Sequence, residues 1–173
     1  LTANYTIESE NMIEEGTADE VRQLVGESYM LRAYVHFLLV NLYGEPYTHC
    51  DPATSKAIPL KLNSDTEAVL TRNTVGEVYS SILSDLVEAE KYLNVDKWEL
   101  GYNYRFTTLA VNALRSRVYL YMGDWAKSFE ASEAVLSVNN QLVDMSSSTI
   151  LPNEYNSSEN ILALEEVMNA QYV

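Results

Sequence analysis

Basic residues and cysteine are scarce in this sequence of 173 residues. Only 11 Lys and Arg stand against 25 Asp and Glu, which gives a formal net charge of −14. Nucleic acids and anionic lipid surfaces bind proteins through basic footprints, so this charge argues against both as partners. The single cysteine, Cys50, excludes a disulfide framework and a four-cysteine zinc site within the chain.

Long hydrophobic runs are also missing. The most apolar stretch, 29–43, is interrupted by Arg32 and His36 and is shorter than the roughly 20 residues that a membrane-spanning helix needs. Apolar residues nevertheless make up 47% of the chain, as in globular proteins and unlike disordered ones. The length therefore predicts one folded domain without a transmembrane helix.

Apolar residues recur at three- and four-residue spacings along the chain, and no alternating strand pattern competes. Capping boxes at Thr17–Glu20 and Thr74–Glu77 predict the starts of two long helices. The first is expected to run to about Tyr43, with Gly44 as its C-cap glycine. A shorter helix is expected within residues 1–15.

Residues 107–122 and 125–138 predict two more helices, separated only by Gly123 and Asp124. Gly123 suits the left-handed C-cap conformation and Asp124 offers an N-cap oxygen, so the two helices are expected to form an antiparallel hairpin. The stripe of the second helix that is expected to face its partner consists of Trp125, Ser128, Phe129, Ser132, Val135 and Leu136. The predicted fold class is therefore all-α, built from antiparallel helix pairs of the tetratricopeptide-like type. Residues 105–138 match the 34-residue period of that repeat.

Two long polar connections, 44–73 and 139–158, separate the predicted helices, and loops of this length are usually functional, disordered or packed against another part of the protein. Trp98, Tyr102 and Tyr104 cluster in a third linker. An exposed aromatic cluster with polar neighbours could stack on sugar rings, whereas the alternative is that these residues cap the ends of the adjacent helices. The tail 159–167 suits a short helix or a strand equally.

The residues that could support catalysis or metal binding do not form a recognisable site. His49 and Asp51 flank Cys50, but consecutive side chains point in different directions, so no metal site is expected. His36 lies on an apolar helix face and is expected to be packed and hydrogen-bonded. Acidic pairs such as Asp85 and Glu88 are expected on solvated helix faces. Phosphate-loop, nucleophile-elbow and zinc-helix motifs are missing from the sequence, which therefore predicts a protein without enzymatic activity, metal or cofactor.

Several short motifs between about Glu27 and Leu136 occur in the order typical of one protein family. They are Leu31-Arg32-Ala33-Tyr34, Asn41-Leu42-Tyr43-Gly44-Glu45-Pro46-Tyr47, Ile58-Pro59-Leu60, Arg72-Asn73-Thr74-Val75 with Glu77-Val78-Tyr79 and Asp85-Leu86, and Arg117-Val118-Tyr119-Leu120-Tyr121-Met122-Gly123-Asp124-Trp125. Ser157-Ser158-Glu159-Asn160-Ile161 follows where the family chain resumes after a variable loop. The sequence resembles the SusD/RagB family of outer-membrane nutrient-binding lipoproteins.

This resemblance implies a tetratricopeptide-like helical domain in a lipid-anchored protein of the cell surface. Such proteins bind an oligosaccharide or other nutrient and deliver it to a SusC-like TonB-dependent transporter of the outer membrane. Because family members are normally several hundred residues long, we expect residues 1–173 to be a fragment of the helical region, without the N-terminal anchor and the C-terminal region. The matched motifs resemble scaffold, in which Arg32 and Arg117 are expected to bond loop carbonyls or carboxylates.

The resemblance carries no binding residue over to this chain, so the aromatic residues Trp98, Tyr102 and Tyr104 remain the candidates for ligand binding. The alternative function is a tetratricopeptide-like module for protein–protein interaction that binds no glycan. Such a module would need a concave face supplied with Asn, Lys and Arg, and the chain has only 11 basic residues.

Overall fold

The computed structural model describes residues 1–68, 70–99, 101–152 and 154–163. In these ranges the chain is helical, without strands, which confirms the predicted all-α class. An isolated bridge between Lys56 and Thr74 is the one strand-type pairing of the described residues. The elements are α1 (Thr2–Glu8), η1 (Glu10–Met12), α2 (Ala18–Tyr43), η2 (Tyr47–His49), α3 (Val75–Tyr92), α4 (Thr108–Met122) and α5 (Trp125–Leu136).

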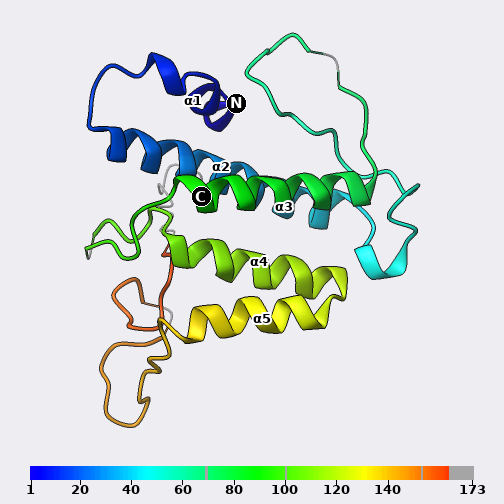
Figure 1. Cartoon of the computed structure of the whole chain (residues 1–173). Helices are drawn as coiled ribbons and strands as arrows, with labels where there is room; N and C mark the ends of the chain where they lie inside the picture. Colours follow the sequence, from blue (N-terminus) through cyan, green and yellow to red (C-terminus); the bar gives the residue numbers. More distant parts are fainter. Residues whose placement is uncertain (69, 100, 153, 164–173) are drawn as a thin grey trace, which may run out of the picture.

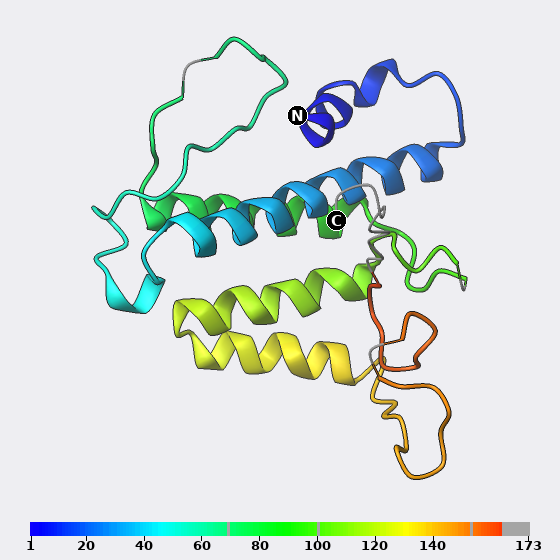
Figure 2. The same cartoon turned by 180° about the vertical axis from the view of Figure 1, so that it is seen from behind.

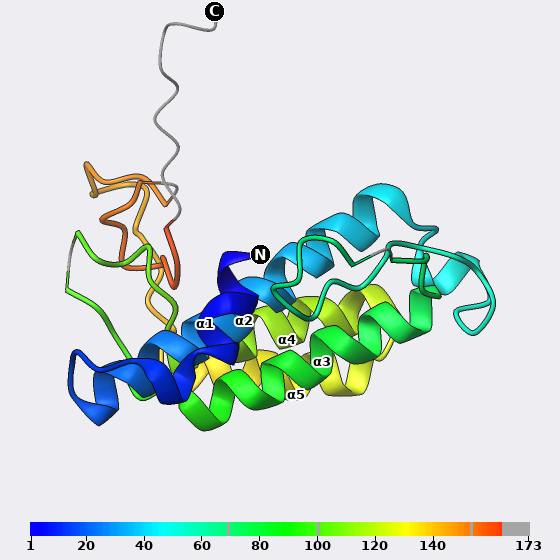
Figure 3. The same cartoon turned by 90° about the horizontal axis from the view of Figure 1, so that it is seen from above.

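The four long helices lie side by side. Figures 1 and 2 show α4 next to the α2–α3 pair and α5 beyond α4, while α1 packs on the other side of α2. Figure 3 shows that the 93–107 loop and the segment after α5 gather at one end of the bundle, away from η2. The bundle therefore presents two loops together at one end.

The α2–α3 pair forms the centre of the core. Both predicted capping boxes are present, with reciprocal hydrogen bonds between Thr17 and Glu20 and between Thr74 and Glu77. The largest fully buried side chains come mainly from these two helices; they are Tyr79, Met30, Ile82, Leu86, Val25, Val40, Val75, Val78, Val111 and Val118. Burial of this apolar surface, at roughly 25 cal/mol per Å², is the main force that holds the pair together.

A buried ion pair lies beside this core and corrects one prediction. Asp85 is not on a solvated face: it is 4% exposed and accepts two hydrogen bonds from Arg32, at 2.6 Å and 2.9 Å. Arg32 also donates to Asn4 and to the carbonyl of Leu62, which confirms its expected bonding to carboxylates and loop carbonyls. The prediction failed because apolar periodicity does not reveal a cation on the neighbouring helix.

The α4–α5 hairpin forms as predicted at its turn. Gly123 adopts a left-handed conformation with φ 77°, and the side chain of Asp124 accepts a hydrogen bond from the Lys127 amide. The assignment of 105–138 as one 34-residue repeat unit stays a prediction.

The facing stripe predicted for α5 is only partly right. Ser128 and Val135 are buried as expected, but Trp125 and Phe129 are each 67% exposed, and Leu136 is also exposed. The hairpin seam is made of small side chains instead: Ser116 of α4 and Ser132 of α5 share a hydrogen bond at 2.6 Å. Small residues let the two helices approach closely, so the bulky members of the stripe lie outside the seam.

Gly44 is the C-cap of α2, as predicted, and its amide donates a hydrogen bond to the carbonyl of Val40. Its φ of −98° is extended rather than left-handed. A Cβ at this position would lie 2.6 Å from the carbonyl oxygen of Val40, so close packing favours glycine here. In the tail, 159–163 form neither a helix nor a strand, and Leu164 and Val167 of the predicted element lie outside the described residues.

Candidate functional site

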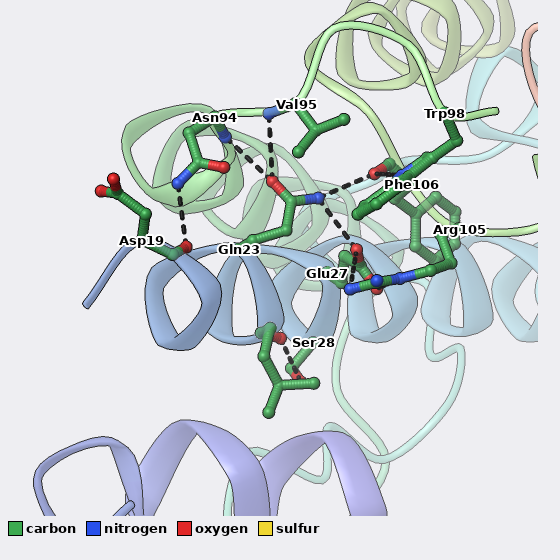
Figure 4. Close-up of polar contacts among 10 residues, drawn as sticks. Asp19, Gln23, Glu27, Ser28, Asn94, Val95, Trp98, Arg105 and Phe106 are labelled. Carbon is green, nitrogen blue, oxygen red and sulfur yellow. Dashed lines mark hydrogen bonds and ion pairs between the residues drawn. The ribbon is translucent and has the colours of Figure 1, made fainter. Parts of the chain in front are cut away.

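The 93–107 loop between α3 and α4 carries all three aromatic candidates, and one glutamine holds both of its ends (Figure 4). The side chain of Gln23, on α2, is 2% exposed. Its carbonyl oxygen accepts hydrogen bonds from the amides of Asn94 at 2.9 Å and Val95 at 3.2 Å. Its amide nitrogen donates to the carbonyl of Phe106 at 3.0 Å. The start and the end of the loop are therefore fixed to the same helix position.

A second contact, one helical turn further along α2, supports the end of the loop next to Phe106 and, through Trp98, its middle. Glu27 forms an ion pair with Arg105 at 2.9 Å and also accepts a hydrogen bond from Gln23 at 2.8 Å. The Arg105 guanidinium lies 4.0 Å from the centre of the Trp98 ring, a cation–π contact that Figure 4 shows. The indole N–H of Trp98 donates to the carbonyl of Phe106 at 3.1 Å. Trp98 is thus covered on one face and tied into the loop.

Gly26 allows the loop to begin against α2. A Cβ at Gly26 would lie 2.8 Å from the backbone nitrogen of Leu93 and 2.9 Å from its Cγ. Real Cβ atoms do not approach backbone atoms this closely, so any larger residue would displace Leu93. Because Leu93 is the C-cap of α3, the position of the loop depends on this close approach.

The two tyrosines are placed differently from Trp98. Tyr102 is 54% exposed and Tyr104 is 52% exposed, and their ring centres lie 6.4 Å apart with an interplanar angle of 37°. Turn hydrogen bonds join the Tyr102 amide to the carbonyl of Glu99 and the Arg105 amide to the carbonyl of Tyr102, each at 3.0 Å. The structure therefore separates a half-buried indole that anchors the loop from two tyrosine rings that face solvent.

A cavity of about 360 Å³ lies beside this loop, between α2, α4 and the 159–162 segment. Its walls are mostly apolar, with Arg117 and Glu159 as the charged members. Its lining consists of Met30, Tyr34, Phe106, Ala110, Ala113, Leu114, Arg117, Glu159, Ile161 and Leu162. The bonding expected of Arg117 is not seen with any described residue.

His36, His49 and Cys50 are the remaining residues that the sequence offered for chemistry. In the described part of the chain, no group of three or more His, Cys, Asp and Glu side chains could hold a metal ion. The ring of His49 contacts the Thr48 hydroxyl at 3.0 Å, while Cys50 is half-buried.

His36 is buried as predicted, but its Nδ1 has no hydrogen-bond partner among the described residues, which corrects the expectation of a bonded ring. Burial lowers the pKa of His36 because the protonated ring would lose its hydration. The ring is therefore a neutral part of the core.

The sequence named the three aromatic residues of the loop but missed Gln23, Glu27 and Arg105, which position it. The available signal was the spacing of Gln23 and Glu27, four residues apart on a long helix with Leu24 and Val25 between them. Polar side chains four residues apart lie on the same helix face, but only the fold shows that this face meets the loop.

The described helices include none that is long and apolar enough to cross a membrane. Residues 1–120 match the protein family described as "Starch-binding associating with outer membrane". The SusD-like protein P38 of Formosa agariphila is 29% identical over 117 residues, which cover 68% of this chain and 21% of that protein.

Solved structures of SusD-like proteins have the same fold. A SusD superfamily protein from Bacteroides thetaiotaomicron is 29% identical and superposes with a TM-score of 0.72, over 82% of this chain and 31% of that one. A SusD-like carbohydrate binding protein from Bacteroides vulgatus is 23% identical, with a TM-score of 0.76 over 92% of this chain and 33% of that one. The chain thus spans a third or less of the length of these relatives. Sequence and fold agree that it belongs to the SusD/RagB family.

Proposed function

We propose that the protein binds neutral oligosaccharides through Tyr102 and Tyr104. The observation that carries this proposal is a pair of half-exposed tyrosine rings on a loop that Gln23 and Glu27 hold in place. Aromatic faces with polar neighbours suit the apolar faces and hydroxyl groups of sugars. A loop that is fixed before binding loses little conformational entropy when the ligand arrives. The family's description as starch-binding and outer-membrane-associated supports the same ligand class.

The charges around the tyrosines favour a neutral ligand. Of the two cations in the loop, Arg105 is already paired with Glu27 and stacked on Trp98, and Lys97 has the acidic residues Asp96 and Glu99 close by in the sequence. The chain as a whole carries a net charge of −14. A glycan with carboxylate or sulfate groups would meet electrostatic repulsion at this surface, whereas a neutral one would not.

The proposal extends to the whole protein as a binding protein rather than an enzyme. It would stand at the cell surface through a lipid anchor and deliver its oligosaccharide to a SusC-like TonB-dependent transporter. The family's association with the outer membrane supports this location.

The alternative, an interaction module for peptides, receives less support from the structure. Such a module needs basic side chains that are available to a partner. Arg32, Arg105 and Arg115 are each ion-paired to a carboxylate within the chain. These three cations are thus engaged within the chain, whereas the exposed rings of Tyr102 and Tyr104 are available to a glycan.

The experiment combines calorimetric titration of the protein against neutral malto- and laminari-oligosaccharides with affinity capture from outer membranes. Saturable binding of an oligosaccharide and co-purification of a TonB-dependent transporter would support the two parts of the proposal separately. If no oligosaccharide of the panel binds, the proposed ligand class is wrong. If no transporter is captured, the delivery step is wrong.

A further inference from the structure

A second loop meets the tyrosine loop at the residue between its two exposed rings. The side-chain amide of Asn103 donates a hydrogen bond to the carbonyl of Tyr155 at 2.6 Å, and the amide of Ala163 donates to the carbonyl of Asn103 at 3.0 Å. The two loops lie at the same end of the bundle in Figures 1 and 3. The segment after α5 is thus joined to the candidate site.

Tyr155 brings a third exposed ring to this junction. Its side chain is 54% exposed, the same fraction as that of Tyr102. Tyr102 and Tyr104 are the immediate neighbours of Asn103 in the sequence. Their Cα atoms therefore each lie about 3.8 Å from the Cα atom of Asn103. The hydrogen bond from Asn103 places the backbone of Tyr155 against that same residue, and so beside the segment that carries Tyr102 and Tyr104.

Hydrogen bonds within the second loop hold the backbone around Tyr155. The amide of Glu154 donates to the carbonyl of Leu151, and the amide of Ser157 donates to the carbonyl of Glu154, each at 3.0 Å. The Glu154 carboxylate accepts a hydrogen bond from the Leu151 amide at 3.0 Å. Tyr155 therefore sits in a closed turn, and its exposed ring is presented from an ordered backbone.

We infer that Tyr155 is a third binding residue, and that the site extends over both loops to take several consecutive rings of a neutral oligosaccharide. This inference rests on the proposed function and deepens it. One loop offers only the closely spaced pair Tyr102 and Tyr104, whereas the second loop adds a surface beyond it. Glu99 and Glu154 flank the tyrosines in the two loops, which disfavours an anionic chain. A short sugar reaches one loop and a longer one reaches both.

The test compares ligands of two lengths by calorimetric titration. A laminari- or malto-hexasaccharide is titrated into the wild type and into Tyr155→Ala, and the corresponding disaccharide is titrated in parallel. Loss of one aromatic contact is expected to weaken hexasaccharide binding about tenfold, while disaccharide binding changes by less than about twofold. Tyr43→Ala is the matched control, because Tyr43 is 65% exposed at the opposite end of α2 and should leave both affinities unchanged.

A second variant tests the junction without removing a ring. Asn103→Asp replaces the amide donor by a carboxylate that cannot bond the Tyr155 carbonyl, so it should reduce hexasaccharide affinity and spare disaccharide affinity. Melting temperatures near that of the wild type show that each variant is folded. Equal hexasaccharide affinity of the wild type and Tyr155→Ala would overturn the inference and leave the proposed function intact. If the wild type binds no oligosaccharide, the proposed function itself fails and the inference fails with it.

Discussion

Replacement of Gln23 by leucine should loosen the 93–107 loop without disturbing the core. Leucine has a similar size but offers no acceptor to the amides of Asn94 and Val95 and no donor to the carbonyl of Phe106. The Phe106 carbonyl still accepts a hydrogen bond from the indole N–H of Trp98. The substitution therefore leaves only the backbone amides of Asn94 and Val95 without their partner. An unsatisfied buried group costs about 1–3 kcal/mol. Water can reach the exposed Asn94, so we expect a total loss of about 2 kcal/mol.

Two measurements together test this expectation. Urea unfolding followed by circular dichroism gives the change in the free energy of unfolding from the shift of the midpoint. Amide hydrogen exchange then locates the change: protection should fall at Asn94 and Val95 and persist in the α2–α3 core. Gln141→Leu is the matched control, since Gln141 is exposed and such substitutions usually change stability by less than about 0.5 kcal/mol. If Gln23→Leu is no more destabilising than this control, Gln23 does not hold the loop.

Three further predictions concern packing, charge and pH. Gly26→Ala should destabilise the fold by about 1–3 kcal/mol in urea unfolding, because the added methyl group would collide with the backbone of Leu93. Asp85→Asn should cost about 3 kcal/mol in the same assay, because it leaves the buried Arg32 without its counter-charge. Burial raises the pKa of Tyr79 to about 12, so the stabilisation that its neutral phenol contributes should be complete below about pH 10. This stabilisation should be lost between about pH 10 and 12, which lowers the free energy of unfolding by up to about 3 kcal/mol. Tyr79→Phe should flatten this part of the pH dependence of the melting temperature.

Each of these predictions has a result that contradicts it. Wild-type stability of Gly26→Ala would mean that Leu93 can move aside at no cost. Lys91→Ala, which breaks a surface ion pair, should change stability by less than about 0.5 kcal/mol; an equally small effect of Asp85→Asn would refute the role of burial. An unchanged slope above pH 10 in Tyr79→Phe would show that other groups titrate there.

Local signals in the sequence predicted the elements of the fold well. Thr17 and Thr74 begin helices because their hydroxyl groups satisfy free backbone amides, and this depends only on residues three positions away. The same holds for Gly123 and Asp124, which determine the hairpin turn through their own conformations. Local chemistry was sufficient at these positions.

Contacts between elements were predicted less well. Trp125 and Phe129 belong to an apolar face of α5, but periodicity does not tell whether a neighbouring helix covers that face. For the candidate site, the sequence predicted which loop carries the aromatic residues and not which of them would be exposed. That difference depends on Arg105 and Gln23, which contact the loop only because the chain folds back on α2.

The central claim is that Tyr102 and Tyr104 form the surface on which a neutral oligosaccharide binds. Its most direct test is calorimetric titration of the oligosaccharide that the wild type binds best into the double variant Tyr102→Ala/Tyr104→Ala. The double variant should lose at least about tenfold in affinity with an unchanged melting temperature, because the removed rings are exposed and support no core contact. An affinity equal to that of the wild type would contradict the claim and place the glycan site elsewhere on the protein.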